Sequence, residues 1–330
     1  MGRRLKLADL GWSPFFERQL VPEEAGSSLP GRVTGMQRTG VTVTLETGEH
    51  EAPLGGRWHR GDAESRPAVG DWVLFDGHSG RIDRLLRRRS LLKRIQPGAS
   101  SRVQVIGANV DTLFVVTSCN EEFNLSRLER YLSLAHEGNV RPVLVLTKRD
   151  LAADPAKFAE QAATLGEGLD VFPVNALDRA TLDGVAAFCR RGRTVALAGS
   201  SGVGKSTLIN TLSGADVQAT ASVRGDRKGR HTTTSRSLHL LPRGGLLLDS
   251  PGIRELQIAG AGVGALFADV ENLARGCRFA DCAHRSEPDC AVRQAVLDGE
   301  LEERRLDNYL KLRREEGETN SSFVQRRVKG

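Results

Sequence analysis

A stretch of nine residues constrains the fold of this chain more than any other feature. It reads Gly199-Ser200-Ser201-Gly202-Val203-Gly204-Lys205-Ser206-Thr207 and fits the pattern G-x-x-x-x-G-K-S/T of a phosphate-binding P-loop. An apolar run at 194–198 precedes it, and a helical pattern at 208–212 follows it. These flanks matter because a chain with 36 glycines also contains glycine loops that bind nothing. The order of strand, loop and helix therefore favours a nucleotide site.

The residue types in this loop suit a bound triphosphate. Gly199, Gly202 and Gly204 let the backbone turn so that successive N–H groups point into one concavity. The helix that begins near Gly204 adds its positive end beneath the phosphates. Lys205 offers a point charge to the β- and γ-phosphates, and the Ser206 hydroxyl is a hard ligand for Mg²⁺. We predict that the whole loop binds nucleotide and that Lys205 is catalytic.

A second polar group follows the apolar run 143–146. It reads Thr147-Lys148-Arg149-Asp150 and resembles the N/T-K-x-D element of GTPases, with Thr147 where many GTPases have Asn. A carboxylate at Asp150 can accept hydrogen bonds from the ring N–H and the exocyclic amine of guanine, whereas adenine presents neither in that arrangement. An unpaired carboxylate would cost on the order of 1–3 kcal/mol or more. We therefore predict that these four residues bind guanine, with Lys148 over the base.

The segment after the next predicted strand, 171–174, adds to the base site. Asn175 and Ala176 stand there, where GTPases present a backbone N–H to the guanine oxygen. Many GTPases have Ser where this chain has Asn175. We predict that both residues contact the nucleotide.

A segment rich in Gly, Arg, Lys and Thr, 221–236, has the composition of a nucleotide-sensing switch. Thr233 offers a hydroxyl for the Mg²⁺ that Ser206 also binds, and Thr232 is the next choice. These threonines could instead be ordinary loop residues. His231 could position the attacking water, or it could serve switch structure or RNA contact.

The run Asp249-Ser250-Pro251-Gly252 fits a second switch. Asp249 would hold Mg²⁺ through water, and the Gly252 N–H would contact the γ-phosphate and sense its loss. Ile253 follows, where an apolar side chain cannot orient an attacking water, so we expect slow intrinsic hydrolysis. Ordinary GTPases place the base-reading element last, whereas here it precedes the P-loop. The domain is therefore circularly permuted, and whatever follows the second switch is attached directly to it.

Three of the five cysteines lie after position 276 and form the pattern C-x4-C-x-H-x5-C. Cys277, Cys282, His284 and Cys290 supply three thiolates and one imidazole, which complete a tetrahedral zinc shell. Such a shell leaves no position for a catalytic water, so we predict one structural zinc ion. Disulfides or unrelated buried cysteines are the alternative. Cys189 stands apart in a predicted helix and is expected to be a core residue.

The N-terminal part differs in character. Residues 1–29 have little periodicity and predict an arm with at most one short helix. Short alternating strands at 32–35, 41–45, 71–75 and 81–92 predict a small β-barrel, for which an OB-fold is one candidate. A basic run follows, containing Arg84, Arg87, Arg88, Arg89, Lys93 and Arg94. It suits phosphate contacts or, alternatively, a solvated strand edge.

Apolar strands that alternate with helices between residues 111 and 198 predict a parallel α/β sheet. The formal net charge is +6, which favours a polyanionic partner, although it is also compatible with a merely basic surface. No apolar run reaches the ~20 residues that span a bilayer, and the first residues do not resemble a signal peptide. We expect no membrane partner and a cytoplasmic location.

Taken together, these features resemble the small-ribosomal-subunit-dependent GTPase family, RsgA/YjeQ, over nearly the whole chain. Besides the motifs above, the resemblance rests on Gly70-Asp71-Trp72-Val73, Asn109-Val110-Asp111, Phe123-Asn124 and Arg130-Tyr131-Leu132. It implies an arm at 1–29, an OB-fold domain at 30–95, a circularly permuted GTPase domain at 96–256, and a mainly helical zinc-binding domain with a basic tail at 257–330.

The resemblance implies an activity as well: slow hydrolysis of GTP to GDP and phosphate, stimulated by the small ribosomal subunit, during late maturation of that subunit through rRNA binding. It implies a monomer that uses Mg²⁺ with GTP. Two other functions stay open at this point. One is an RNA-binding assembly factor that uses GTP chiefly as a regulatory latch. The other is a P-loop ATPase or small-molecule kinase, which Asp150 disfavours.

Overall fold

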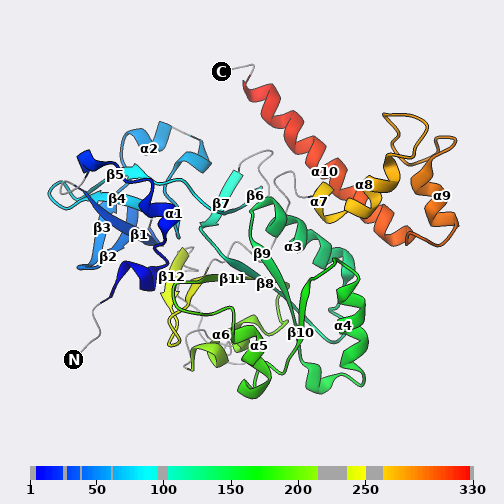
Figure 1. Cartoon of the computed structure of the whole chain (residues 1–330), viewed down its shortest axis with the longest axis horizontal. Helices are drawn as coiled ribbons and strands as arrows, with labels where there is room; N and C mark the ends of the chain where they lie inside the picture. The colour runs from blue at the N-terminus through cyan, green and yellow to red at the C-terminus, as the bar shows by residue number, and fades with distance from the viewer. Residues whose placement is uncertain are drawn as a thin grey trace, which may run out of the picture.

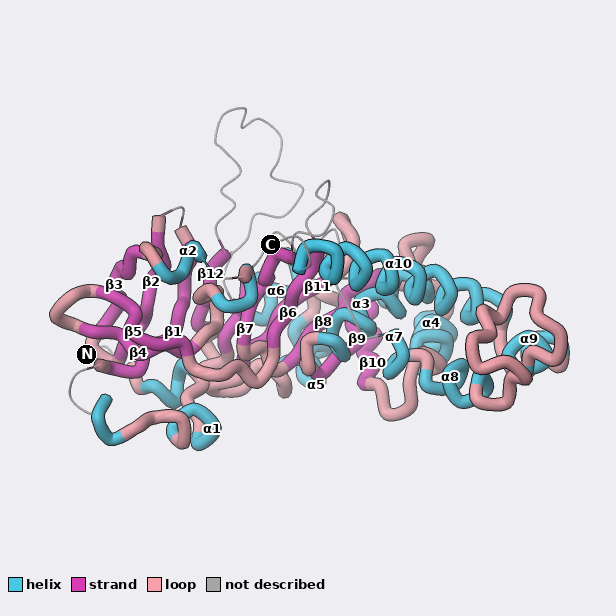
Figure 2. The backbone as a smooth tube through the Cα atoms, turned by 90° about the horizontal axis from the view of Figure 1, so that it is seen from above, coloured by secondary structure: helices cyan, strands magenta, loops and turns pink. Residues whose placement is uncertain are grey.

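The computed structural model describes residues 5–24, 28–37, 39–60, 62–95, 103–214, 236–249 and 263–327. Three groups of elements lie roughly in line, with the N-terminal strands at one end, a central sheet flanked by helices, and C-terminal helices at the other end (Figure 2). The long C-terminal helix runs back from that end across the central group (Figure 1).

The N-terminal strands pair antiparallel around a small apolar core. They are β1 (Leu29–Met36), β2 (Gly40–Leu45), β3 (Gly48–Pro53), β4 (Trp72–Asp76) and β5 (Arg81–Leu85), with α2 (Arg57–Arg60) and η3 (Ala63–Ser65) between β3 and β4. Val33, Val43, Phe75 and Ile82 are buried in this core. The strands predicted near 32, 41, 71 and 81 are thus present, whereas the assignment of an OB-fold stays a prediction.

The N-terminal arm is more ordered than its sequence indicates. It forms η1 (Leu7–Leu10), α1 (Pro14–Glu17) and η2 (Pro22–Glu24), where we expected at most one short helix. Phe16 is fully buried, and its ring lies 5.7 Å from that of Trp72 on β4. The arm is therefore held by aromatic packing, which the lack of periodicity did not indicate.

The predicted end of the barrel is divided between two sheets. β5 ends at Leu85, and the next strand, β6 (Leu91–Ile95), pairs instead with β7 (Val103–Ala108) in a sheet of two strands. The Leu91 N–H also donates to the carbonyl oxygen of Gly138. The expected boundary between 95 and 96 thus falls between two paired strands, and the division into domains stays a prediction.

The basic run near the end of the barrel is largely neutralised within the protein. Its partners are Glu24 for Arg84, Asp71 for Arg88, Asp111 for Arg89, and both Glu64 and Glu137 for Lys93. Arg94 donates to the Gln104 side chain, whereas Arg87 is exposed. Most of this run therefore makes internal contacts, and its contact with phosphate groups stays a prediction.

The central sheet has the strand order β10-β9-β8-β11-β13-β12. These strands are β8 (Thr112–Ser118), β9 (Arg141–Thr147), β10 (Asp170–Pro173), β11 (Thr194–Ala198), β12 (Arg236–Leu240) and β13 (Leu246–Asp249). All neighbours pair parallel except β12, which is antiparallel to β13. Strands β8 and β11 are buried along their length, as expected for a parallel sheet covered on both faces.

Helices connect these strands. They are α3 (Leu125–Glu137), α4 (Pro155–Ala163), α5 (Asp183–Ala186) and α6 (Lys205–Ser213), with η4 (Arg149–Leu151) and η5 (Arg179–Leu182). Helix α3 begins after Asn124, whose side chain accepts from the Arg127 N–H. Its apolar face, which includes Leu128, Leu132 and Ala135, is buried. Cys189 is a buried core residue, as predicted.

One strand pair joins the N-terminal strands to the central sheet. β1 pairs antiparallel with β12, with Gly35 opposite Ser237 and Met36 opposite Arg236. The Arg236 guanidinium also donates to the Val105 carbonyl oxygen at 2.7 Å. The result is one continuous mixed sheet of eleven strands, a connection that local sequence patterns do not indicate.

The C-terminal group contains α7 (Val263–Leu266), α8 (Ala268–Ala274), α9 (Ala291–Leu297) and α10 (Glu303–Arg327). Helix α10 packs against α3 and α7, with Leu306, Tyr309 and Leu312 buried. Among the described helices, none has both the length and the apolar character needed to cross a membrane.

Candidate functional site

The P-loop joins β11 to α6 at the carboxyl edge of the central sheet, as its sequence predicts. Gly199, Gly202 and Gly204 have positive φ values of 146°, 80° and 92°, a region that favours glycine. A Cβ atom at Gly199 would lie 2.1 Å from the Val116 carbonyl oxygen. The loop therefore follows the neighbouring strand too closely for any side chain at that position.

The predicted catalytic lysine lies across the loop. Lys205 Nζ donates to the carbonyl oxygen of Gly199 at 2.8 Å and also to that of Ser200. Lys205 is the first residue of α6, so its ammonium group stands beside the amino end of the helix. The ammonium group and the positive end of the helix therefore lie together, and this arrangement attracts a phosphate group.

The predicted base-reading segment is hydrogen-bonded to this loop. The Thr147 hydroxyl oxygen lies 2.5 Å from the Val203 carbonyl oxygen and 3.1 Å from that of Thr117. Thr147 is fully buried at the end of β9. The hydroxyl of Thr147 thus has a defined structural partner in the loop.

The residues after Thr147 turn away from the sheet. Lys148 adopts the left-handed conformation, with φ 57° and ψ 31°. The Arg149 N–H donates to the Val174 carbonyl oxygen at 3.2 Å, which ties this turn to the segment that follows β10. Asp150 is exposed, so its carboxylate can be reached by a ligand.

Two threonines hold the second predicted base-contacting segment. The Thr181 hydroxyl donates to the Asn175 carbonyl oxygen at 2.9 Å and accepts from the Asn175 N–H at 3.1 Å. The Thr211 hydroxyl, on the helix that follows the P-loop, donates to the Ala176 carbonyl oxygen at 2.6 Å. The P-loop helix therefore fixes this turn as well.

Asp249 ends β13 on the same edge. β13 runs parallel to β11 with Leu248 opposite Ala196, so both strands deliver their last residues to the same end of the sheet. The other predicted switch residues, Thr233, Thr232, His231 and Gly252, lie outside the described residues, and their roles stay predictions.

The four predicted metal ligands come together. Their ligand atoms all lie within 4.8 Å of one another, and the Sγ atoms of Cys277 and Cys290 are 3.8 Å apart. His284 Nδ1 lies 3.6 Å from Cys277 Sγ and 3.5 Å from Cys290 Sγ. With zinc–sulfur bonds of about 2.3 Å, the sulfur atoms of a tetrahedral site lie about 3.8 Å apart. The donor set and its spacing therefore fit a structural zinc ion.

Glu287 organises the loop between two of these ligands. Its carboxylate accepts from the backbone N–H groups of Ala283, Arg285 and Ser286 at 2.8–3.0 Å. The backbone N–H of Glu287 itself has the largest effect, and together with these bonds it lowers the pKa of Glu287 to about 2. Glu287 thus stays ionised over the usual pH range and holds the turn that presents His284.

Sequence reasoning did not identify one further residue that contacts the P-loop. The Arg127 guanidinium donates to the Ser200 hydroxyl oxygen at 2.5 Å. Arg127 is on α3, which follows the strand next to β11. A signal existed, because neighbouring parallel strands place the helices that follow them at the same edge. The strand order needed to use that signal was not evident from the sequence.

Comparison with known proteins adds an independent line of support. Residues 85–259 match the family model described as RsgA GTPase. The "Small ribosomal subunit biogenesis GTPase RsgA 2" of Vibrio vulnificus is 47% identical over 97% of this chain and 91% of its own length. The "Small ribosomal subunit biogenesis GTPase RsgA" of Mesorhizobium japonicum is 46% identical over 93% of this chain and 88% of its own length.

Solved structures are similar too. YjeQ from Thermotoga maritima is 27% identical and superposes with a TM-score of 0.62, covering 86% of this chain and 97% of that one. YloQ, described as a circularly permuted GTPase, also has a TM-score of 0.62, at 24% identity, covering 90% of this chain and 96% of that one. The latter supports the fold alone.

Proposed function

This chain belongs to the RsgA GTPase family and is a GTP hydrolase of small-subunit biogenesis, and we propose that the carboxyl edge of its central sheet is the GTP site. The observation that carries this assignment is the hydrogen bonding of Thr147 to Val203. That bond supports the proposal because it joins the P-loop to the segment predicted to read guanine. Neither an ATPase nor a small-molecule kinase needs this combination.

In the bound state, the P-loop N–H groups and Lys205 would hold the β- and γ-phosphates. Asp150, which is exposed, would accept from the guanine ring N–H and amine. Asn175 and Ala176 would offer a backbone N–H to the guanine oxygen, on a turn that Thr181 and Thr211 hold in place.

Oxygen donors for Mg²⁺ stand at the same edge. Ser206 is in the first turn of α6, and Asp249 ends β13, so a hydroxyl and a carboxylate, both hard ligands, are available. A bound Mg²⁺ would supply charge neutralisation between the β- and γ-phosphates. Lys205 and the loop amides would stabilise charge that develops as the bond to the γ-phosphate breaks.

We further propose that the small ribosomal subunit stimulates hydrolysis, in late maturation and through rRNA contact. The support comes from the sequence, because Ile253 follows the second switch motif and cannot orient a water molecule. Thr233, His231 and Gly252 would then complete the site on the subunit. The same proposal includes four further points. The N-terminal strands would form an OB-fold, and the Cys277 cluster would bind a zinc ion. The protein would be a monomer and would act in the cytoplasm.

The test is GTP hydrolysis by the purified protein, with and without small ribosomal subunits, beside an ATP control. We expect strong stimulation that is confined to GTP and lost in Lys205→Ala. Unstimulated GTP turnover with intact subunit binding would favour a regulatory latch. Equal turnover of ATP would contradict the guanine assignment.

A sharper test addresses Asp150. Asp150→Asn replaces one acceptor by an amide N–H, which can donate to the carbonyl that xanthine has in place of the guanine amine. We expect this variant to lose GTP affinity and to gain affinity for xanthosine triphosphate. Asp154→Asn, which changes a helix cap beyond the site, is the matched control and should keep the preference for GTP. An unchanged preference in Asp150→Asn would contradict the proposed pose.

A further inference from the structure

Helix α3 contacts the P-loop through one of its faces. Arg127 donates to the Ser200 hydroxyl oxygen at 2.5 Å. The Ser200 carbonyl oxygen in turn accepts from Lys205 Nζ. A residue of α3 therefore fixes the loop residue that accepts from the predicted catalytic lysine.

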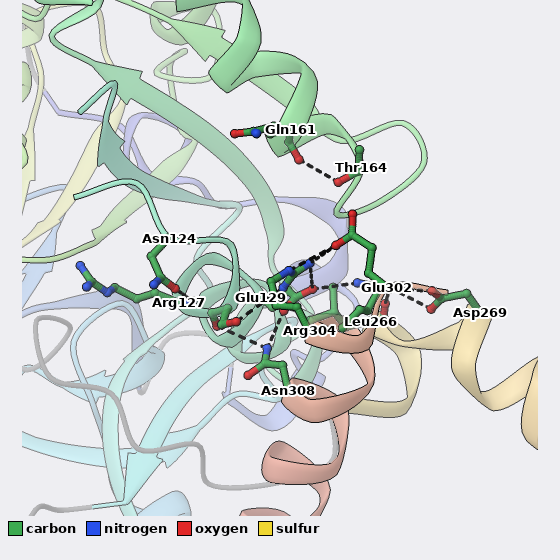
Figure 3. A network of polar contacts seen from close by, with 12 residues as sticks. Asn124, Arg127, Glu129, Gln161, Thr164, Leu266, Asp269, Glu302, Arg304 and Asn308 are labelled. Carbon is green, nitrogen blue, oxygen red and sulfur yellow. Dashed lines mark hydrogen bonds and ion pairs between the residues drawn. The ribbon is translucent and has the colours of Figure 1, made fainter. Parts of the chain in front are cut away.

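The opposite side of α3 contacts the C-terminal helix. Glu129 accepts from Arg304 at 3.0 Å, from Arg305 at 2.9 Å and from the Asn308 amide. Figure 3 shows Arg304 and Asn308 of α10 converging on Glu129, with Arg127 on the other side of α3. Arg130 adds a two-bond pair with Glu315, at 2.9 Å for each bond. The contact between the helices is therefore ionic and directional.

Glu129 is the centre of this contact. Its side chain is fully buried, and a buried carboxylate is stable only while its partners stay in place. If α10 moved away, Glu129 would lose three donors at once and would have to reach water. Movement of α10 therefore has to be accompanied by movement of α3 near Glu129.

We propose that Arg127 is a positioning residue for the P-loop and that α10 sets its position through Glu129. This inference rests on the proposed GTP site. Glu129 and Arg127 are two residues apart on one helix, so a movement of the helix backbone at Glu129 also moves Arg127. A partner that binds the C-terminal group and displaces α10 would then loosen Ser200 and change nucleotide affinity.

The experiment measures release of the fluorescent nucleotide mant-GDP from the full-length protein. Arg127→Leu removes the donor to Ser200, and we expect release to become about threefold to tenfold faster, as for the loss of one hydrogen bond of ordinary net strength. Arg127→Lys keeps the charge and one donor, so it should restore part of the difference. Arg87→Leu removes an exposed arginine and is the matched control, with an unchanged release rate.

The kinetic constants distinguish positioning from a general effect on folding. Arg127 contacts the loop at the Ser200 hydroxyl, and its proposed role is to position the loop. Its loss should therefore raise KM for GTP in subunit-stimulated hydrolysis and leave kcat unchanged. A lower kcat at constant KM would contradict the positioning role.

The variant Arg304→Gln tests the coupling to α10. The Arg304 side chain is 33% exposed, so its replacement should disturb the fold less than a change at the buried Glu129. We expect faster mant-GDP release, and no further increase when Arg127→Leu is added, since both changes act through one contact path. Lys311→Gln, an exposed position on the same helix, is the control and should release at the wild-type rate.

The results of these release measurements distinguish the proposed GTP site from the proposed coupling between α10 and the P-loop. Wild-type release in Arg304→Gln, or rate increases that multiply in the double variant, would overturn the coupling while leaving the GTP site intact. A wild-type protein that binds no mant-GDP would overturn the proposed site and this inference together.

Discussion

The Thr147 hydroxyl oxygen lies 2.5 Å from the carbonyl oxygen of Val203, so the end of strand β9 is bonded to the middle of the P-loop. The same strand end begins the segment that carries Asp150. In the proposed GTP site, a change in the P-loop would therefore be transmitted directly to the predicted base-reading turn. Recognition of the base and of the phosphates would then be coupled through one side chain.

Thr147→Val tests this coupling with little change in shape. The variant leaves the Val203 carbonyl oxygen without this donor, which costs about 1–3 kcal/mol in a buried site. We expect mant-GDP to bind about fivefold to a hundredfold more weakly, measured by fluorescence titration, since each 1.4 kcal/mol is tenfold.

Thr147→Ser is the matched control, because it keeps the hydroxyl and removes only a methyl group. It should bind mant-GDP close to the wild-type level. Equal affinity in Thr147→Val and the wild type would mean that the bond to Val203 does not support nucleotide binding.

The Cys277 cluster yields a second prediction. Cys282→Ser replaces one thiolate of a complete shell, so the purified protein should contain well under one zinc ion per chain, whereas the wild type should contain one. The melting temperature should fall, because the loop from 277 to 290 would lose its metal crosslink. Metal analysis by mass spectrometry and a thermal scan measure both effects.

Cys119→Ala is the control for that experiment. Cys119 is buried in the core and far from the cluster in the sequence, so its loss can lower stability but should leave one zinc ion per chain. Full zinc content in Cys282→Ser would argue against the predicted ligand set.

Glu137, at the end of α3, makes stability depend on pH. Burial raises its pKa above the ordinary value of 4.5, against the lowering effect of Lys93, and Glu64 and Glu316 raise it further. One of its oxygens, Oε2, has no hydrogen-bond partner among the described residues. The ionised form is thus disfavoured in the folded state.

The sign of the effect follows from linkage. A carboxyl group whose pKa is raised by folding stabilises the folded state at low pH, and that stability is lost as the pH rises through the raised pKa. Glu137→Gln should therefore have a higher melting temperature than the wild type at pH 7. Below about pH 4 this difference should disappear, because Glu137 is then neutral in both the folded and the unfolded wild type. A lower melting temperature at pH 7 would mean that the bond to Lys93 outweighs burial.

Much of the central fold follows from local sequence patterns. The apolar runs before Thr147 and Gly199 are buried parallel strands, and Asn124 caps the helix predicted to follow it. The P-loop glycines have the positive φ angles that their spacing requires. The metal cluster was also predictable, because ligand type and spacing alone define it.

The features that were missed depend on contacts between distant segments. The burial of Phe16 against Trp72, the pairing of Gly35 with Ser237 and the approach of Arg127 to Ser200 leave no periodic signal. The internal ion pairs of the basic run were missed for the same reason. Its acidic partners, from Glu24 to Glu137, are spread over more than a hundred residues.

Arg32 provides the last prediction, since it joins segments that the sequence keeps far apart. Its buried guanidinium donates to the carbonyl oxygens of Leu10, Gly70 and Asn109 and to the Thr194 hydroxyl oxygen. Burial lowers the pKa of Arg32 to about 10, so it stays charged at pH 7. Arg32→Met fills a similar volume but leaves these acceptors without their donor. We expect the free energy of unfolding, from urea titration, to fall by about 3 kcal/mol or more.

Two further variants serve as comparisons for the loss of stability expected in Arg32→Met. Arg32→Lys keeps the charge but not the planar fork, so it should recover only part of the stability. Arg81→Met, at an exposed position on β5, should stay within about 0.5 kcal/mol of the wild type. If Arg32→Met were as stable as the wild type, the four acceptors would have to find other donors, and Arg32 would not be what fixes the arm and the N-terminal strands to the central sheet.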